Sequence, residues 1–575
     1  MNAVDILKIG THSYDSCFQE NGEIYDPVFK EPFQYGTPYY ALCNAVLALK
    51  MEGAERDDHI RRAVKALDAA LNHVVRLDSP IPMATVDRDT GCSWRVNHRD
   101  FFWPAVIRTY TILRDLGQKT ESFKRNIRSV DVEKSFRSRP PSNWAAVWLS
   151  GEWLRIREEL SPNSLNRFDE WLEVFFQERI MLEKGFYQEP GHPNSYDLFT
   201  RFFMADILNA GYNGRLKKEL IKLMETGFER SLRVQLSDGS LASAHRSTGL
   251  TWTLGVQCAY FTYAAKFFES KDKVKSQLAK VAARRALSSF VRWQRKNGYY
   301  SPVENCLPVG YRVGFERYTS EGNHGPLALG FLAVAILNGF EDEPLASGTS
   351  RKPSVLIEHD PIYRAIAHYG PYSVHFNAFP SPDYDGFGIV DMTFGPNRFL
   401  HFVSSVKSLT TGKFLNVGMA YKDEQVDGEL TIIARKDFRL INGFQKVEGE
   451  DYCGFSLEAR CRGEWYTYAA AVRIGENGIE IEESTPGLNN FKSLLIPYLR
   501  DPGTGTTTDI DIKKNEKRIR LIHGNEEIEF ALTQKIHRVI HLPYGYENRR
   551  GLCGLIRVDL EGRMQGISYR VRIVR

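Results

Sequence analysis

The first part of the chain, up to about Gly339, places apolar residues with the period of an α-helix. Ten such segments are separated by polar loops. Several of them, such as 143–160 and 252–270, are apolar nearly all round, as expected of helices in an inner ring or a large core. The ten predicted helices are 38–51, 59–75, 103–117, 143–160, 165–182, 196–211, 215–232, 252–270, 281–298 and 325–339.

These helices follow one another as hairpins without a strict sequence repeat. A solenoid would show self-similarity at a fixed period, and this sequence has none. About ten paired helices suit a ring of helical hairpins better. The sequence therefore predicts an α/α toroid, in the form of an incomplete barrel, over residues 1–340.

The pattern changes at about Glu341. Residues 341–355 are polar and contain Pro and Gly, which is typical of a linker. Beyond them lie short alternating runs, rich in β-branched and aromatic residues and separated by turn pairs such as NG and DG. Many short, evenly spaced strands pack as two sheets, so residues 356–575 predict an antiparallel β-sandwich. The predicted fold class is mixed α then β, in two domains.

One stretch, 185–211, combines a polar loop with a strongly apolar helix: GFYQEPGHPNSYDLFTRFFMADILNAG. Its loop carries His192, Asn194 and Tyr196, and its helix begins at about Asp197. A rigid helix behind a polar loop is a common way to hold a catalytic group. We therefore expect this stretch to form the rim of an active site.

Composition limits the classes of partner. The chain has 575 residues, 42% of them hydrophobic and 25% charged, which is ordinary for a soluble protein of two large domains. Its net charge of +4 comes from 75 basic and 71 acidic residues, so the whole chain has no general attraction to nucleic acid or to membranes. No stretch offers ~18 uninterrupted apolar residues for a membrane span. A homo-oligomer is left open.

The cysteines and the first residues bear on the compartment. Eight cysteines are scattered without CxxC pairs, which favours reduced thiols over a disulfide framework or a zinc site. The first residues lack a basic start followed by an apolar run of signal-peptide length. We expect a cytoplasmic protein, or a periplasmic or secreted one if a leader was trimmed.

Three motifs occur in a suggestive order: NWAAVWLSGEW, then GHPNSYDLFTRFFMADIL, then DGSLASAHRSTGLTWTLG. This order resembles that of the heparinase II/III and alginate-lyase type of polysaccharide lyases, which combine an α/α toroid with a β-sandwich. The resemblance implies that Asn143 holds the substrate carboxylate and that Tyr196 is the base or the acid. It implies His245 or His192 as the partner of Tyr196, and Arg246 as a contact to a further acidic group.

The chemistry of such an enzyme can also be matched to residue types. Removing the C5 proton of a uronic acid needs donors that neutralise the carboxylate, a base with a pKa near neutrality, and an acid for the leaving oxygen. Asn, Arg, His and Tyr provide these functions. The candidates in predicted loops are Asn143, His192, Tyr196 and His245 for catalysis, and Asn194, Arg246, Tyr311, Tyr318 and His324 for substrate binding.

Each candidate also has a structural interpretation. Asn143 could simply cap its helix, because SN before an apolar run is a common start signal. Tyr196 could pack its ring on Phe199 or Phe203. His192, between Gly191 and Pro193, could be a hydrogen-bonding loop residue.

Two other functions stay open. A glycoside hydrolase on the same toroid, for example a glucuronidase, would need two carboxylates, for which Glu189, Asp197, Glu316 and Glu321 are candidates. A non-catalytic glycan-binding protein would use the 12% aromatic residues to stack on sugar rings.

Nucleotide, zinc-protease and serine-hydrolase motifs are absent from the sequence. We therefore predict no cofactor, and leave a structural divalent cation open. Lyases of the resembled type often carry a further histidine from the β-domain, and His359, His368, His375 and His401 are all eligible. The leading hypothesis is a polysaccharide lyase that cleaves an acidic oligosaccharide or polysaccharide by β-elimination.

Overall fold

The computed structural model describes residues 2–32, 35–75, 84–86, 93–95, 99–190, 195–316, 318–340, 351–381, 383–395, 405–410, 412, 414–422, 438–461 and 466–574. Its contacts divide the chain into two compact units. The first unit consists of Met1–Leu232, Leu250–Val303 and Phe315–Leu345. The second consists of Arg233–Gly249, Glu304–Gly314 and Ala346–Arg575, so two loops of the helical region fold with the strands.

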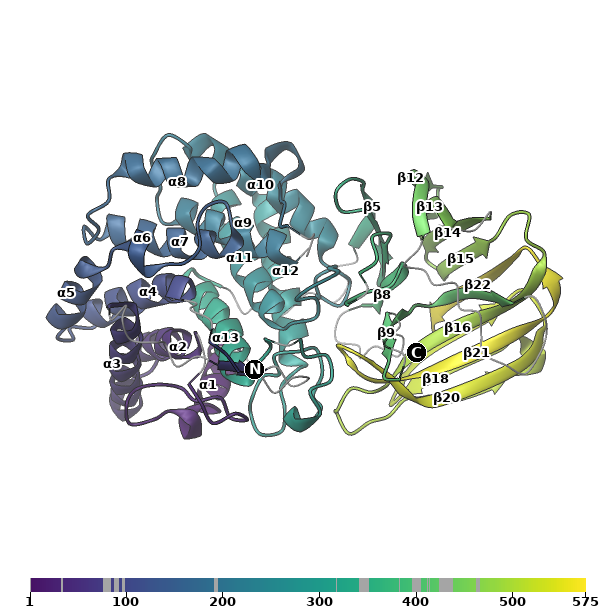
Figure 1. Ribbon diagram of the computed structural model, residues 1–575, viewed down its shortest axis with the longest axis horizontal. Coiled ribbons are helices and arrows are strands. Elements are labelled where there is room, and N and C mark those ends of the chain that lie inside the picture. The colour runs from purple at the N-terminus through teal and green to yellow at the C-terminus, as the bar shows by residue number, and fades with distance from the viewer. Residues whose placement is uncertain are drawn as a thin grey trace. The chain divides into compact units, whose positions relative to one another are not determined.

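Six helices of the first unit form a ring. Nearly all of their side chains are buried, as the all-round apolar pattern predicted. They are α2 (Gly36–Lys50), α4 (Trp103–Asp115), α7 (Asn143–Arg157), α9 (Ser195–Asn209), α11 (Trp252–Phe268) and α13 (Glu321–Leu337). Each contacts the next in this order, and α13 contacts α2 (Figure 1), so the cycle of neighbours closes.

The other helices of this unit are shorter or amphipathic. They are α1 (Ala3–His12), α3 (Gly53–Val75), α5 (Glu121–Ser129), α6 (Val132–Ser135), α8 (Leu165–Glu178), α10 (Lys217–Val234) and α12 (Lys273–Val291). Side-chain caps define several of their starts: Ser164 caps α8 and Asp272 caps α12. Short elements complete the unit: η1 (Asp15–Cys17), η2 (Arg99–Phe102), η3 (Leu182–Lys184) and the hairpins β1–β2 (Ala84–Val86, Ser93–Arg95) and β3–β4 (Ile180–Met181, Phe186–Tyr187).

The predicted helical toroid is confirmed, and its inner ring is complete where the sequence indicated an incomplete one. The ten predicted helices did not include α1, α5 and the four-residue helix α6. Helix α5 buries only Phe123 and Ile127, so its apolar pattern is weak. The ring closes through a close approach at Gly330 of α13, where a Cβ atom would lie 2.3 Å from the ring of Tyr39 on α2.

The described residues of the second unit form three antiparallel sheets. The smallest has the order β5-β6-β7-β8, with β5 (Arg351–Glu358), β6 (Arg364–Gly370), β7 (Tyr372–Asn377) and β8 (Gly388–Phe394). Strand β5 begins inside the stretch 341–355 that was expected to be a linker. The short helix η4 (Val309–Tyr311) also belongs to this unit.

The two larger sheets form the sandwich. One has the order β10 (Phe414–Leu415), β9 (Val406–Ser408), β20 (Ile536–Asn548), β21 (Gly551–Met564), β16 (Asn490–Asp501), β11 (Gly418–Lys422). The other has the order β12 (Phe438–Glu448), β13 (Tyr452–Cys461), β14 (Thr467–Gly475), β15 (Gly478–Ser484), β22 (Gly566–Ile573), β19 (Glu526–Leu532), β18 (Arg518–His523), β17 (Asp509–Lys513), with η6 (Lys514–Glu516) between β17 and β18.

Both larger sheets contribute to one continuous cluster of buried apolar side chains, which includes Ile481 of β15 and Val558 of β21. Along β14, buried and half-buried residues alternate, as expected of a strand with one face in a core. The predicted antiparallel β-sandwich is confirmed. In the described part of the chain, no helix has both the length and the apolar character that a membrane span requires.

Candidate active site

Aromatic residues and a histidine at the starts of the six inner helices gather at one end of the ring. We call them the ring-end cluster. Its members are Tyr35 just before α2, Phe101 just before α4, Trp144 in α7, Tyr196 in α9, Trp252 in α11 and His324 in α13.

Ring contacts connect the members of this cluster. The ring of Tyr35 stacks on Phe101 with centroids 4.7 Å apart, and Phe101 lies 5.8 Å from Trp144. Tyr196 and Trp252 have centroids 6.0 Å apart. Phe199 of α9 joins the two sides, because it contacts both Phe101 and Tyr196.

Tyr35 and His324 form the polar centre of the ring-end cluster. The Tyr35 hydroxyl lies 3.4 Å from Nε2 of His324, and the backbone N–H of Tyr35 donates to Oδ1 of Asn323 at 3.0 Å. Burial raises the pKa of the Tyr35 phenol, and the nearby phenols of Tyr196 and Tyr39 raise it further.

Tyr196 makes the packing contact that its structural interpretation predicted, and its predicted function in catalysis stays a prediction. Its ring meets Phe199 edge-on at 6.1 Å, which is the packing that the structural interpretation expected. The residue is 9% exposed, and its ring also lies against that of Trp252. The ring of Tyr196 therefore packs on Phe199 and Trp252, and its hydroxyl adds a polar group to the ring-end cluster.

Asn143 begins α7 but does not cap it. The cap is Ser142, whose hydroxyl accepts from the backbone N–H of Ala145 at 3.3 Å. The amide Nδ2 of Asn143 donates instead to Oε1 of Glu189 at 2.5 Å. Its Oδ1 atom is buried and has no hydrogen-bond partner among the described residues. A buried amide with an unused acceptor is an unusual feature in a folded protein.

Glu189 orients this amide together with Tyr187. The Tyr187 hydroxyl lies 2.9 Å from Oε2 of Glu189 and 2.8 Å from the carbonyl oxygen of Pro141. Burial raises the pKa of Tyr187, and the adjacent Glu189 carboxylate raises it further. Glu189 therefore holds two donors, one of which is Asn143.

Asp197 belongs to a buried ion-pair network. Its Oδ1 accepts from Nε of Arg201 at 2.8 Å, and its Oδ2 accepts from Arg201 at 2.9 Å and from Nε of Arg230 at 3.1 Å. Burial alone would raise the pKa of Asp197, but the two guanidinium groups outweigh it and hold the pKa below its ordinary value. Both carboxylate oxygens are thus occupied.

The other two candidate acids differ in burial. Glu321 is buried at the start of α13 and accepts from Nη1 of Arg295 at 2.5 Å. Glu316 is half-buried, and its backbone N–H donates to the hydroxyl of Thr319. Tyr318 lies beside the ring-end cluster, with its ring centroid 5.8 Å from that of His324.

The remaining site predictions concern residues outside the described ranges or residues of the second unit. His192 and Asn194 lie outside the described residues. His245, Arg246 and Tyr311 belong to the second unit. The backbone N–H of His245 donates to Asp385 at 2.6 Å and its ring stacks on Phe379, whereas Tyr311 is 67% exposed. Their predicted function at the active site stays a prediction.

The histidines of the second unit differ in their contacts. His368 uses both ring nitrogens, Nδ1 with the Ser373 hydroxyl and Nε2 with the backbone oxygen of Arg233, each at 2.7 Å. His375 is fully buried and contacts Asp391 at 3.0 Å. His359 is exposed, and His401 lies outside the described residues.

Sequence reasoning missed most of the ring-end cluster. Tyr35, Phe101, Trp144 and Trp252 were not among the candidates. A signal was available for Tyr35, because the segment 31–38, EPFQYGTP, has the same Gly- and Pro-bearing loop before an inner helix as the segments that were selected. Phe101 gave no comparable signal.

A large hollow lies on the second unit. It has a volume of about 770 Å³ and runs over the eight-stranded sheet. Its lining includes Glu458 and Glu482 over a floor of small residues such as Ala469 and Ala471. It has no tyrosine or histidine in its lining, so it lacks the side chains of the predicted chemistry.

Comparisons with known proteins give structural likeness only. No family model matches the sequence, and no curated protein matches it. Among solved structures, heparinase III matches at 10% identity and a TM-score of 0.35, over 99% of this chain and 91% of that chain. A mutant of the chondroitin AC lyase of Streptomyces coelicolor A3 matches at 9% identity and a TM-score of 0.46, over 99% and 79%.

A glycoside hydrolase is among the matches too. The α-1,6-mannanase of Salegentibacter sp. HEL1_6 matches at 12% identity and a TM-score of 0.39, over 59% of this chain and all of that chain. The resemblance to polysaccharide lyases that the motifs indicated thus recurs among solved structures. TM-scores below 0.5 do not establish function, so the chemistry must come from the residues of this chain.

Proposed function

We propose that this chain is a carbohydrate-active enzyme that cleaves a uronic-acid-containing oligosaccharide or polysaccharide by β-elimination. One observation carries the proposal: the Tyr35 phenol lies 3.4 Å from the His324 imidazole, and the rings of Phe101 and Phe199 connect Tyr35 to Tyr196 at the same end of the ring. The adjacent inner helices α7 and α9 begin with Asn143 and with the Ser195–Tyr196 pair. These are the residue types that uronate elimination requires.

The proposed reaction assigns a function to each group. The Nδ2 amide of Asn143 donates to the substrate carboxylate, which makes the C5 proton more acidic. A phenolate or imidazole takes that proton, and the electron pair forms the C4–C5 double bond. The bond from C4 to the bridging oxygen breaks, and the oxygen leaves with its electron pair and receives a proton from a phenol or imidazole.

Tyr196 is the proposed base or acid of this reaction. It lies at the start of an inner helix, its ring contacts those of Phe199 and Trp252, and Tyr35 of the same cluster contacts His324. The hydroxyl of Tyr35 and Nε2 of His324 lie within hydrogen-bonding distance of each other, and each group can donate or accept a proton. Glu189 is a proposed positioning residue, because it holds the amide of Asn143 in one orientation.

The environment of the carboxylates favours elimination over hydrolysis. A glycosidase needs one carboxyl group as acid and another as nucleophile or base. Both oxygens of Asp197 accept from arginines, and Glu321 is paired with Arg295. Glu189 accepts from Asn143 and contacts Tyr187. These bonds reduce the ability of the three acids to act on a glycosidic bond.

The proposal is tested by incubating the protein with a panel of uronate-bearing glycans. We expect ultraviolet absorbance to rise as the C4–C5 double bond forms, in step with the release of reducing ends. Reducing ends without this absorbance would replace the lyase by a glycoside hydrolase. Binding without either signal would favour a non-catalytic glycan-binding protein.

Variants then test the site. Tyr196→Phe should lower kcat by about 10²–10⁴-fold, the usual contribution of general acid–base catalysis, without loss of the folded state. Tyr110→Phe is the matched control, because Tyr110 is a buried tyrosine of the inner helix α4 outside the ring-end cluster. A Tyr196→Phe enzyme with wild-type kcat would remove Tyr196 from the mechanism.

A further inference from the structure

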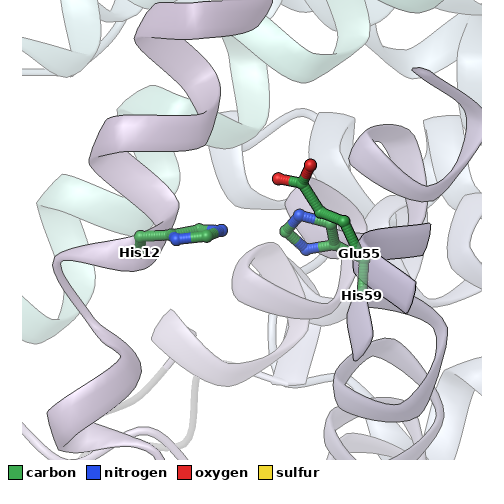
Figure 2. Close-up of side chains that lie close together, drawn as sticks. All are labelled: His12, Glu55 and His59. Carbon is green, nitrogen blue, oxygen red and sulfur yellow. The ribbon is translucent and has the colours of Figure 1, made fainter. Parts of the chain in front are cut away.

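Three side chains that the proposed reaction does not use meet on helices α1 and α3. His12 ends α1, and Glu55 and His59 lie in the first two turns of α3. Figure 2 shows the ring of His12 directed toward Glu55 and His59. One potential ligand atom from each of the three lies within 4.8 Å of the others.

Helical spacing places these groups on facing surfaces. Glu55 and His59 are four residues apart, so their side chains lie on the same face of α3. Lys8 and His12 have the same spacing on α1, and Lys8 contacts Glu55 at 2.5 Å. The rings of His12 and His59 have centroids 5.3 Å apart. The face of α1 that carries Lys8 and His12 thus lies against the face of α3 that carries Glu55 and His59.

His59 gives an independent sign of a ligand. The residue is only 1% exposed, and its Nδ1 lies 2.8 Å from Oδ1 of Asn44. Because Nδ2 of Asn44 donates to the backbone oxygen of Tyr40, Oδ1 is the acceptor and Nδ1 carries the proton. The lone pair of His59 is therefore on Nε2, which is buried and has no hydrogen-bond partner among the described residues.

A histidine held by an amide oxygen on one nitrogen, with a lone pair on the other, is the usual arrangement of a metal ligand. A buried nitrogen without a partner is otherwise costly. We propose that His12, Glu55 and His59 bind a divalent transition-metal ion, with zinc as the preferred ion. His59 contributes Nε2, Glu55 one carboxylate oxygen and His12 one ring nitrogen.

The ligand types favour zinc over calcium or magnesium. Imidazole nitrogens suit zinc, copper and nickel, whereas calcium and magnesium prefer sites made of oxygen atoms. Zinc bonds of about 2.0–2.1 Å in a tetrahedron place the ligand atoms about 3.4 Å apart. The present separations need to shrink by little more than an ångström, and the His12 side chain, which is 40% exposed, can move that far.

The ion would act as a clamp between two helices. Helix α1 packs on α2 and α13, which are the helices where the inner ring closes. The three ligands leave a fourth position for water, because the side chains of His12 and Glu55 are both 40% exposed. The metal would thus connect α1 to α3 next to α2 and α13, the helices between which the ring closes.

Zinc titration of the full chain tests this site. We expect one zinc ion per wild-type chain, a rise in Tm with zinc, and at least tenfold weaker binding for His12→Ala and Glu55→Gln. Both substitutions alter side chains with exposed surface, so the variants should fold. The matched control is His537→Ala, an exposed histidine of the second unit, which should bind zinc like the wild type.

Lys8→Ala sharpens the test. Removing this ammonium group from Glu55 should tighten zinc binding by about two- to fivefold, the scale of an exposed ion pair. Tetrahedral Co²⁺ in place of zinc should give intense visible absorption that is lost in His12→Ala. Equal zinc affinity in the wild type and His12→Ala, or no stoichiometric zinc in the wild type, would overturn the proposal.

Discussion

Ser142 and Asn143 are neighbours at the start of α7 and make different interactions. Ser142 caps the helix, whereas Asn143 donates to Glu189 and keeps a buried Oδ1 without a partner among the described residues. A cap contributes about 1 kcal/mol to stability. A donor to a developing negative charge contributes about 10²–10³-fold to kcat.

The two substitutions should therefore separate stability from catalysis. Ser142→Ala should lower the free energy of unfolding by about 1 kcal/mol with little change in kcat. Asn143→Ala should lower kcat by about 10²–10³-fold. Denaturant titration and steady-state kinetics measure the two effects. An Asn143→Ala variant that is unstable but has wild-type kcat would assign Asn143 to structure.

Single residues show which roles could be predicted from the sequence and which could not. The SN pair was correctly seen as a helix start, but the cap is Ser142 and not Asn143 as the structural interpretation proposed, since either side chain can accept from the first turn. For Asp197, one of its two arginine partners is Arg230, which is 33 residues away on another helix. Contacts of that kind depend on tertiary packing, which a local pattern does not contain.

At the scale of elements, Asp197 holds the start of α9 in place, directly after Tyr196. Asp197 binds Arg201 on its own helix and Arg230 on α10. All three side chains are almost fully buried. Removing the anion would leave two buried cations without compensation, which typically costs about 3–5 kcal/mol.

Asp197→Asn should therefore lower the free energy of unfolding by about 3–5 kcal/mol at pH 7. Because the pKa of Asp197 is depressed in the folded state, its contribution is present above the ordinary value of about 3.9. That contribution is lost as the pH falls through the folded pKa, so the Tm difference from the wild type should shrink below about pH 4.

The exposed pair Arg167–Glu170 on α8 provides the control. Glu170→Gln should change stability by less than about 1 kcal/mol, because solvent screens that pair. If Asp197→Asn behaved like Glu170→Gln, the buried network would not stabilise α9. Retained kcat in a stable Asp197→Asn variant would show that the network does not position Tyr196.

The elements themselves were largely predictable. All-round apolar helices and alternating strands follow from local periodicity, which is why the inner helices and the sandwich were correctly predicted. Helix α5 and strand β5 were missed, since the first buries only two residues and the second begins in a polar, Pro-containing stretch. In such segments tertiary packing, and not the local helix or strand propensity, decides the secondary structure.

At the scale of the whole molecule, the first unit depends on contacts between distant parts of the sequence. Helices α2 and α13 close the ring, although almost 290 residues separate Tyr35 from its partner His324. The order of hairpins predicted a toroid but not its closure. The same closure brings Tyr35 to His324, which explains why the centre of the ring-end cluster was not predicted.

The mass of the reaction products tests the central claim most directly. Elimination forms the double bond without adding water, so each new non-reducing end should be lighter by one water molecule than a hydrolysis product. We predict this unsaturated end from a uronate-bearing glycan with the wild-type protein and its near absence with Tyr196→Phe. Products that all carry a saturated new end would contradict β-elimination.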